Sequence, residues 1–124
     1  MRRAFACAAT LMALAAVPAS AQTQLEMNER AGNGLRQAEA RMDAVYAKVL
    51  GRISDAGKEN LQAAQETWRH FRDQECEFET MGTVGGSIHS MIVAICLTRL
   101  TDQRIKDLEA QLNCKEGDLS CGGQ

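Results

Sequence analysis

The chain has 124 residues, a formal net charge of −2, five cysteines, 45% hydrophobic residues and only 4% aromatic residues. This length fits one domain, and the composition excludes collagen, low-complexity disorder and a membrane protein with several spans. The slight acidic excess argues against nonspecific nucleic-acid binding, which requires a basic surface.

The first 21 residues are typical of a secretory signal peptide. Arg2 and Arg3 precede an uncharged apolar stretch at 4–17, and Ala19-Ser20-Ala21 fits a small-residue cleavage site. A membrane anchor is the alternative, but the stretch is shorter than the roughly 20 residues that span a bilayer. Cleavage after Ala21 leaves residues 22–124 with a net charge of −4, because two Arg and no acidic residue are lost. We therefore expect a periplasmic or extracellular protein without stable membrane insertion after cleavage.

The first predicted helix of the mature chain is amphipathic. Thr23 and Glu26 have the spacing of a capping box, which places its start near Thr23. Gly32 and Gly34 would each cost roughly 0.5–1 kcal/mol relative to alanine, so the helix is expected to kink there or to begin only afterwards. Apolar residues at steps of three and four predict its buried face, with Tyr46 and Ile53 flanking it: Leu35, Ala38, Met42, Val45 and Val49.

The second predicted helix runs from about Ala56 to Thr80. Ser54 or Asp55 is expected to cap it. Its charged residues, Arg72 and Asp73 among them, are expected on a solvated face. The same three–four spacing predicts an inward face made of Leu61, Ala64, Trp68, Phe71 and Phe78.

A glycine-rich loop at residues 81–87 leads to the third predicted helix, for which Ser87 is the expected cap. This helix begins apolar on nearly all sides, which predicts a central helix covered by both others. It is expected to end before Asn113, where a polar tail begins. The predicted fold is all-α: an antiparallel three-helix bundle at 22–113, stapled by disulfides, followed by a tail at 114–124.

Removal of the signal peptide also removes Cys7 and leaves four cysteines, an even number that indicates two disulfides in an exported domain. Four cysteines allow three connectivities, and the spacing alone does not choose among them. The predicted helical hairpin brings Cys76 and Cys96 to similar levels, which favours their pairing and leaves Cys114 for Cys121.

Glutamates gather near the end of the second predicted helix, at Glu75, Glu77 and Glu79. Glu75 and Glu79 share a helix face and could in principle perform acid–base chemistry. A solvated charged face is the better interpretation, because a slim helical bundle offers no sugar cleft between two carboxylates. We therefore expect no catalytic residues.

Ser87 and His89 lie at the start of the third predicted helix. They could form a nucleophile and base, but no GxSxG turn accompanies them, so an exposed histidine beside a capping serine is preferred. A metal site at His89 and Cys96 would need a free thiol, which export disfavours. We expect neither metal nor cofactor.

Residues spread over the mature chain form one set of motifs: Ala64-Gln65, Trp68, Phe71-Arg72, Cys76 to Glu79, Gly85 to Ile88, Cys96-Leu97, Leu100-Thr101, Arg104 and Leu108. As a set they resemble the lysozyme-inhibitor LprI-like family over about residues 24–112. A further segment, residues 42–46, is similar to the family's LN-x-x-Y segment with Asp43 in place of Asn. Tyr46, Trp68, Arg72, Thr101 and Arg104 belong to the family motif, and the resemblance implies that they are structural.

The resemblance implies a binding protein, not an enzyme, whose partner is a lysozyme-type enzyme. An acidic inhibitor would be steered toward a basic enzyme. The hypothesis is steric: the loop at 81–89 covers the cleft, Ser87 or His89 bonds to the enzyme's carboxylates, and Glu75, Glu77 and Glu79 meet its basic rim. The alternatives are a non-inhibitory envelope scaffold and a small metal-binding protein.

Overall fold

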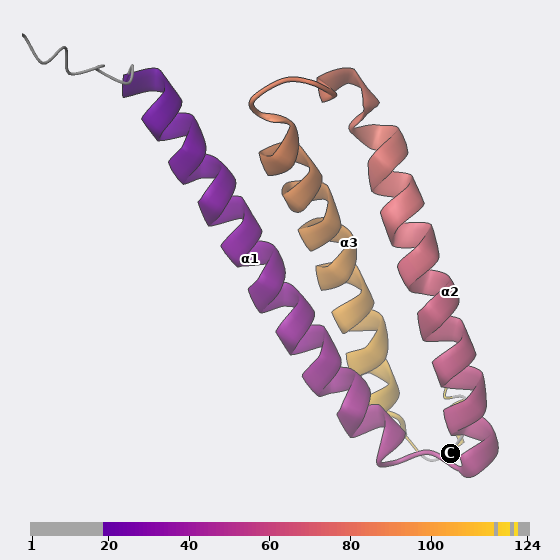
Figure 1. Cartoon of the computed structure of the whole chain (residues 1–124). Coiled ribbons are helices and arrows are strands. Elements are labelled where there is room, and N and C mark those ends of the chain that lie inside the picture. Colours follow the sequence, from indigo (N-terminus) through magenta and orange to yellow (C-terminus); the bar gives the residue numbers. More distant parts are fainter. Residues whose placement is uncertain (1–18, 116, 120, 122–124) are drawn as a thin grey trace, which may run out of the picture.

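The protein folds as three α-helices, seen in a computed structural model that describes residues 19–115, 117–119 and 121. They are α1 (Ala19–Leu50), α2 (Asp55–Glu79) and α3 (His89–Leu112), with one 3-10 turn, η1 (Met81–Thr83), between the last two. Successive helices run antiparallel, and α3 lies between α1 and α2 (Figure 1). The predicted all-α three-helix fold with two disulfides is confirmed.

The predicted signal peptide falls mostly on residues 1–18, which lie outside the described residues. The expected cleavage site after Ala21 lies in the first turn of α1. In the part of the chain that the structure describes, none of the helices combines the length and the apolar character needed to cross a bilayer.

α1 is one continuous helix that passes through Gly32 and Gly34, so the expected late start after these glycines is wrong. Contacts with the rest of the bundle explain why this segment stays helical. The Asn28 side-chain amide donates to the Ser87 carbonyl oxygen at 3.1 Å and accepts from Gln24 at 2.9 Å. These contacts before the glycines, and the buried face after them, outweigh the modest cost of two glycines.

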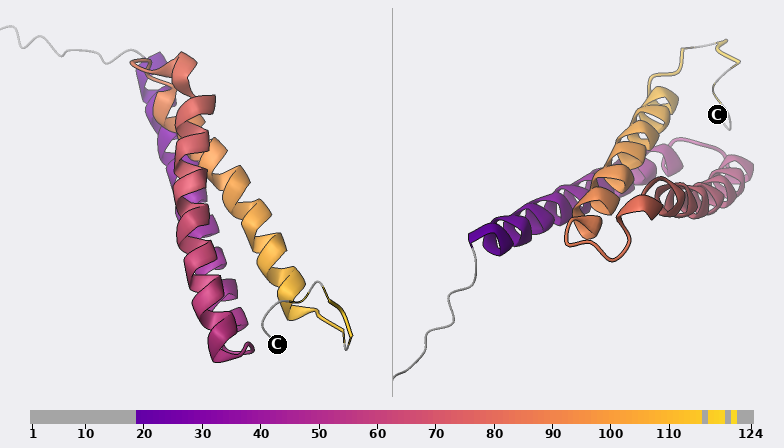
Figure 2. Two further views of the ribbon diagram at one scale, coloured as in Figure 1. Left: turned by 90° about the vertical axis from the view of Figure 1, so that its right-hand side faces the viewer. Right: turned by 90° about the horizontal axis from the view of Figure 1, so that it is seen from above.

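The main hydrophobic core joins α1 to α3. Partly buried side chains of α2, Leu61 and Trp68, pack against it, as Tyr46 does from α1. Figure 2 shows that α2 and α3 diverge away from the loop that joins them. A groove of about 470 Å³ opens there beside Arg104 and Asp107. The buried residues of the core are Met42, Val49, Ile53, Ile105 and Leu108.

The inward face of α2 differs from the predicted one. Phe71 and Phe78 are 52% and 70% exposed, and Ala64 is exposed as well. Each residue turns a helix by about 100°, so an inward face that is shifted by one position in the sequence points in a different direction. The side chains of α2 that face the bundle include polar groups: Leu61, Gln65, Trp68, Arg72 and Cys76.

The start of α2 is capped by Ser54, as predicted. Its Oγ accepts a hydrogen bond from the Gly57 backbone N–H at 3.2 Å. Asp55 follows in the first turn and pairs with Lys58 at 2.8 Å. The hydrogen bond from Lys58 and its positive charge lower the pKa of the Asp55 carboxyl.

Replacing Ser54 with alanine is expected to lower the free energy of unfolding by about 1 kcal/mol, because the Gly57 N–H loses its acceptor. Denaturant unfolding followed by circular dichroism measures the loss. Ser90→Ala is the matched control, since Ser90 is exposed inside α3 and alanine favours helix. Equal destabilisation by both variants would contradict the capping role.

Candidate interaction site

The connection between α2 and α3 is a compact series of turns. The Thr80 hydroxyl donates to the Cys76 carbonyl at 2.7 Å, and the Thr83 hydroxyl donates to the Thr80 carbonyl at 2.8 Å. Backbone bonds continue the series from Gly86 N–H to the Thr83 carbonyl at 3.0 Å and from His89 N–H to the Gly86 carbonyl at 3.1 Å. Local hydrogen bonds of this kind satisfy the loop backbone and hold its shape.

Gly85 is the position in this connection where a side chain would be strained. Its φ of +80° lies in the left-handed region, which residues with a Cβ adopt at a cost. The glycine therefore lets the chain reverse between η1 and α3.

A disulfide closes the base of this connection. Cys76 and Cys96 are joined with their Cα atoms 5.7 Å apart, and both side chains are buried. Beside them, Arg99 of α3 donates to both carboxylate oxygens of Glu79 at 2.7 and 2.8 Å. The two helix ends are thus fixed to each other covalently and by a charged pair.

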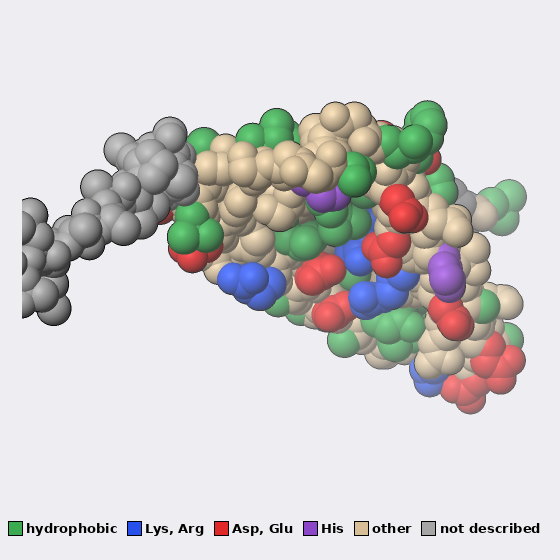
Figure 3. All heavy atoms as spheres, turned by 45° about the horizontal axis from the view of Figure 1, so that its top comes forward, with side chains coloured by type: hydrophobic (Ala, Val, Ile, Leu, Met, Phe, Trp, Pro, Cys, Tyr) green, Lys and Arg blue, Asp and Glu red, His purple; other side chains and the backbone are tan. Residues whose placement is uncertain are grey.

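Large apolar side chains are exposed at this end of the bundle. We call four of them the apex surface: Phe78, Met81, Val84 and Ile88, with exposures of 70%, 63%, 71% and 40%. Figure 3 shows green apolar side chains along the same end of the molecule. Exposed apolar groups that gather on a rigid segment are a common mark of a protein-binding surface.

A groove of about 350 Å³ lies next to the apex surface, between α2 and α3. Carboxylates of Asp73 and Glu77 stand on its α2 side, and His89 stands on its α3 side. The remaining lining residues are Cys76, Thr80, Val84, Val93 and Leu97.

The structure separates the three glutamates expected to act together. Glu77 lines the groove, whereas Glu79 is paired with Arg99. Glu75 is half-buried, and at 100° per residue it lies nearly opposite Glu77 on the helix. Of the glutamates, Glu77 is the one that shares the groove with His89.

Ser87 and His89 do not act as a pair either. α3 begins at His89 after Ile88, and no side chain caps it, so the predicted Ser87 cap is wrong. Ser87 instead offers its backbone carbonyl to Asn28, and the preceding residues already turn the chain through backbone bonds. His89 Nδ1 lies 2.8 Å from Thr83 Oγ1.

The disulfide between Cys76 and Cys96 bears on the metal site considered at His89 and Cys96. A site at His89 and Cys96 requires a free thiol, and Cys96 is bonded to Cys76. Within the described residues, no group of three or more His, Cys, Asp or Glu side chains could hold a metal ion. Cys114 pairs with Cys121 in the tail, which leaves these four cysteines in the predicted pairing.

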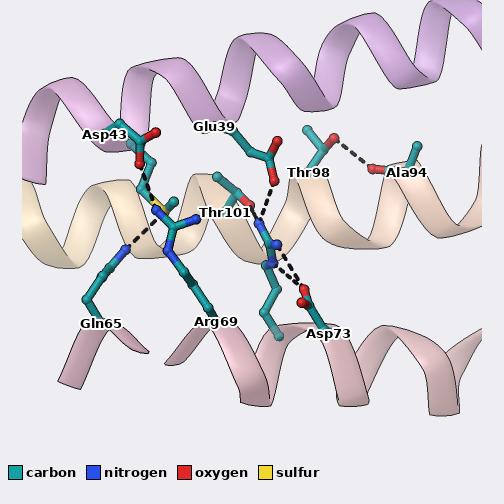
Figure 4. Close-up of polar contacts among 10 residues, drawn as sticks. Glu39, Asp43, Gln65, Arg69, Asp73, Ala94, Thr98 and Thr101 are labelled. Atoms are coloured by element: carbon teal, nitrogen blue, oxygen red, sulfur yellow. Dashed lines mark hydrogen bonds and ion pairs between the residues drawn. The ribbon is translucent and has the colours of Figure 1, made fainter. Parts of the chain in front are cut away.

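A second cluster lies inside the bundle, around Arg72 (Figure 4). The Arg72 residue is 7% exposed. One guanidinium nitrogen donates to Glu39 at 3.0 Å and to Thr101 Oγ1 at 3.3 Å. Nε and the other nitrogen bond to Asp73 at 2.9 and 2.8 Å. One buried cation thus joins α1, α2 and α3, whereas the sequence analysis placed it on a solvated face.

Trp68 extends this cluster, because two guanidinium groups lie over its ring. The Arg72 and Arg104 Cζ atoms are 5.5 and 5.8 Å from the ring centroid, within cation–π range. Arg104 also donates from Nε to Gln65 Oε1 at 2.9 Å, and Gln65 donates to Met42 Sδ at 3.4 Å. Burial lowers the pKa of Arg104, an effect that nearby Asp107 opposes.

The cluster is therefore an internal polar layer, and its buried members are not free to contact a partner. The helix pattern alone placed Arg72 on a solvated face, whereas the family resemblance implied a structural role for Arg72 and included Gln65 among the matching residues. The available signal was spacing: Gln65, Trp68, Arg72 and Cys76 follow one another at steps of four, three and four.

Comparisons with known proteins agree with this architecture. An uncharacterized protein of Rhizobium meliloti (strain 1021) is 28% identical over an alignment of 137 residues. The alignment covers 92% of this chain and 99% of that protein. A crystal structure of a DUF1311 family protein from Pseudomonas putida KT2440 superposes with a TM-score of 0.63. The superposition covers 68% of this chain and 89% of that one at 21% identity, which establishes similarity of fold.

A family model supplies the classification. The model described as lysozyme inhibitor LprI matches residues 15–108, which include α1, α2, η1 and most of α3. That match covers most of the chain, and the chain belongs to the lysozyme inhibitor LprI family.

Proposed function

We propose that this protein is exported and inhibits a lysozyme-type enzyme by covering its substrate cleft with the apex surface. Family membership carries the proposal. It is supported by the exposed apolar side chains Met81 and Val84, which project from a connection fixed by hydrogen bonds and a disulfide. A preformed loop loses little conformational entropy on binding, which favours tight association.

The net negative charge of the protein acts mainly by attracting the enzyme at long range. The chain has a net charge of −2, and predicted loss of the signal peptide makes this −4. Long-range attraction of a basic enzyme would raise the association rate and weaken with salt. We assign the direct polar contacts to Glu77, Ser87 and His89, because Glu79 is already paired with Arg99 and Glu75 lies on another side of α2.

A cell-wall lysis assay tests the proposal. The protein is expected to slow lysis by a purified lysozyme, and Met81→Asp with Val84→Asp is expected to weaken inhibition at least about tenfold, as loss of central anchor residues does. Leu119→Asp is the control, because Leu119 is an exposed apolar residue that lies in the tail, away from the apex surface.

Unchanged lysozyme activity at high micromolar protein would reject inhibition and favour the envelope-scaffold alternative. Inhibition that the apex variant leaves intact would reject the apex as the contact surface.

A further inference from the structure

The groove between α2 and α3 is lined by two carboxylates. Its lining includes the Asp73 and Glu77 carboxylates and no Lys or Arg. Asp73 and Glu77 are four residues apart, so they stand on the same face of α2. Arg72 pairs with both Asp73 and Glu39, so two carboxylates share one guanidinium. Both bonds from Arg72 to Asp73 end on Oδ1, and neither uses Oδ2. The charged groups that line the groove are therefore anionic.

The hydrogen bonds of Thr83 indicate which ring nitrogen of His89 is the donor, and His89 lines the α3 side of the groove. The Thr83 hydroxyl has one hydrogen, which it donates to the Thr80 carbonyl at 2.8 Å. Its contact with His89 Nδ1 at 2.8 Å must then be a hydrogen bond donated by the histidine. In a neutral imidazole that donates from Nδ1, Nε2 carries a lone pair and accepts. A neutral His89 of this tautomer would bring a hydrogen-bond acceptor to the groove that it lines.

The donors that the groove could offer are already used. The Thr80 hydroxyl donates to the Cys76 carbonyl at 2.7 Å, and Cys76 itself is in a disulfide. The other walls are apolar, from Val84, Val93 and Leu97. A ligand that matches this lining must donate hydrogen bonds, carry positive charge and have an aliphatic part.

We propose that the groove receives one basic side chain, Lys or Arg, from the partner protein. The aliphatic stem contacts Val93 and Leu97, and the cationic head is held between the Asp73 and Glu77 carboxylates and His89. Lys and Arg combine an apolar stem with a charged end, as this lining requires. The volume of about 350 Å³ is at the small end of ligand pockets, which suits a single side chain. The inference rests on the proposed function, in which the partner is a basic enzyme.

Small probes test the groove without lysozyme. Acetyl-arginine amide and acetyl-lysine amide are titrated into the isotope-labelled full chain, with neutral acetyl-norleucine amide as comparison. Amide NMR shifts are expected at Glu77, His89 and Val93 with a cationic probe, and weaker ones with the neutral probe. Glu77→Gln is expected to weaken cation binding by about two- to fivefold, as loss of an exposed ion pair does. Glu75→Gln is the matched control and is expected to leave binding unchanged.

Equal binding of the neutral probe, or shifts spread over the whole surface, would overturn the inference. So would equal weakening by Glu77→Gln and Glu75→Gln, because these two glutamates lie on nearly opposite sides of α2.

The lysis assay separates this inference from the proposed function. If cationic probes bind in the groove but lysozyme is not inhibited, the groove assignment stands and the proposed enzyme target fails. If lysozyme is inhibited but probes do not bind and Glu77→Gln inhibits as well as the native chain, the function stands and the groove assignment fails.

Discussion

Replacing both Cys76 and Cys96 with alanine is expected to lower the free energy of unfolding by about 3 kcal/mol. The disulfide joins residues 20 positions apart, one on α2 and one on α3. Its loss increases the conformational freedom of the unfolded chain. For a domain of this size, a fall in the unfolding midpoint of roughly 10–20 °C follows. Calorimetry of the oxidised double variant against the native chain measures both quantities.

The tail disulfide provides the control. Cys114 and Cys121 are seven positions apart, and Lys115, Gly117, Asp118 and Leu119 between them are exposed. A bond that closes a loop outside the core constrains the folded and unfolded chains alike. The Cys114→Ala, Cys121→Ala variant is expected to lose less than about 1 kcal/mol. A larger loss from the tail pair than from the helix pair would contradict this assignment.

Replacing Arg72 with alanine is expected to cost about 3 kcal/mol, because several interactions end together. The variant loses the bonds to Glu39 and Asp73 and the stacking on Trp68. It also removes a hydrogen bond to Thr101, which is 0% exposed. The Glu39 and Asp73 side chains are 36% and 61% exposed, so water can solvate their freed carboxylates and limit the cost. Urea unfolding measures the change.

Arg69→Ala is the matched control for Arg72→Ala. Arg69 lies on the same helix and pairs with Asp43 at 2.8 Å, but these side chains are 44% and 60% exposed. An exposed ion pair contributes less than about 1 kcal/mol, so a small effect is expected. Similar losses in the two variants would show that the internal layer contributes no more than a surface pair.

The sequence predicted the number and order of the helices, and a local signal located the start of α2. Ser54 caps α2 as expected, and the apolar residues from Ala38 to Val49 form the face that α3 covers. The apolar run in α3 predicted a helix covered by both others, and α3 does contact both, but Ile88 and Ile95 of this run stay 40% and 53% exposed. Gly32 and Gly34 misled the prediction of α1, because their cost is small beside contacts that the local sequence does not contain.

The orientation of α2 could not be predicted in the same way. Phe71 looked like a core residue and Arg72 like a surface residue, and their environments are reversed. Arg72 can be buried because Glu39 on α1 and Thr101 on α3 meet it, and these lie far from it in sequence. The hydrophobic pattern of one helix contains no information about partners on other helices. The candidate groove was missed for the same reason, because its two walls come from different helices.

The packing of α1 against α3 has a consequence for how the chain is made. The core joins Met42 and Val49, which are synthesised early, to Ile105 and Leu108, which are synthesised near the end. The apolar face of the first helix therefore has no native partner until almost the whole chain has emerged. Nucleation during synthesis cannot complete this core, so folding must follow release of the C-terminal part.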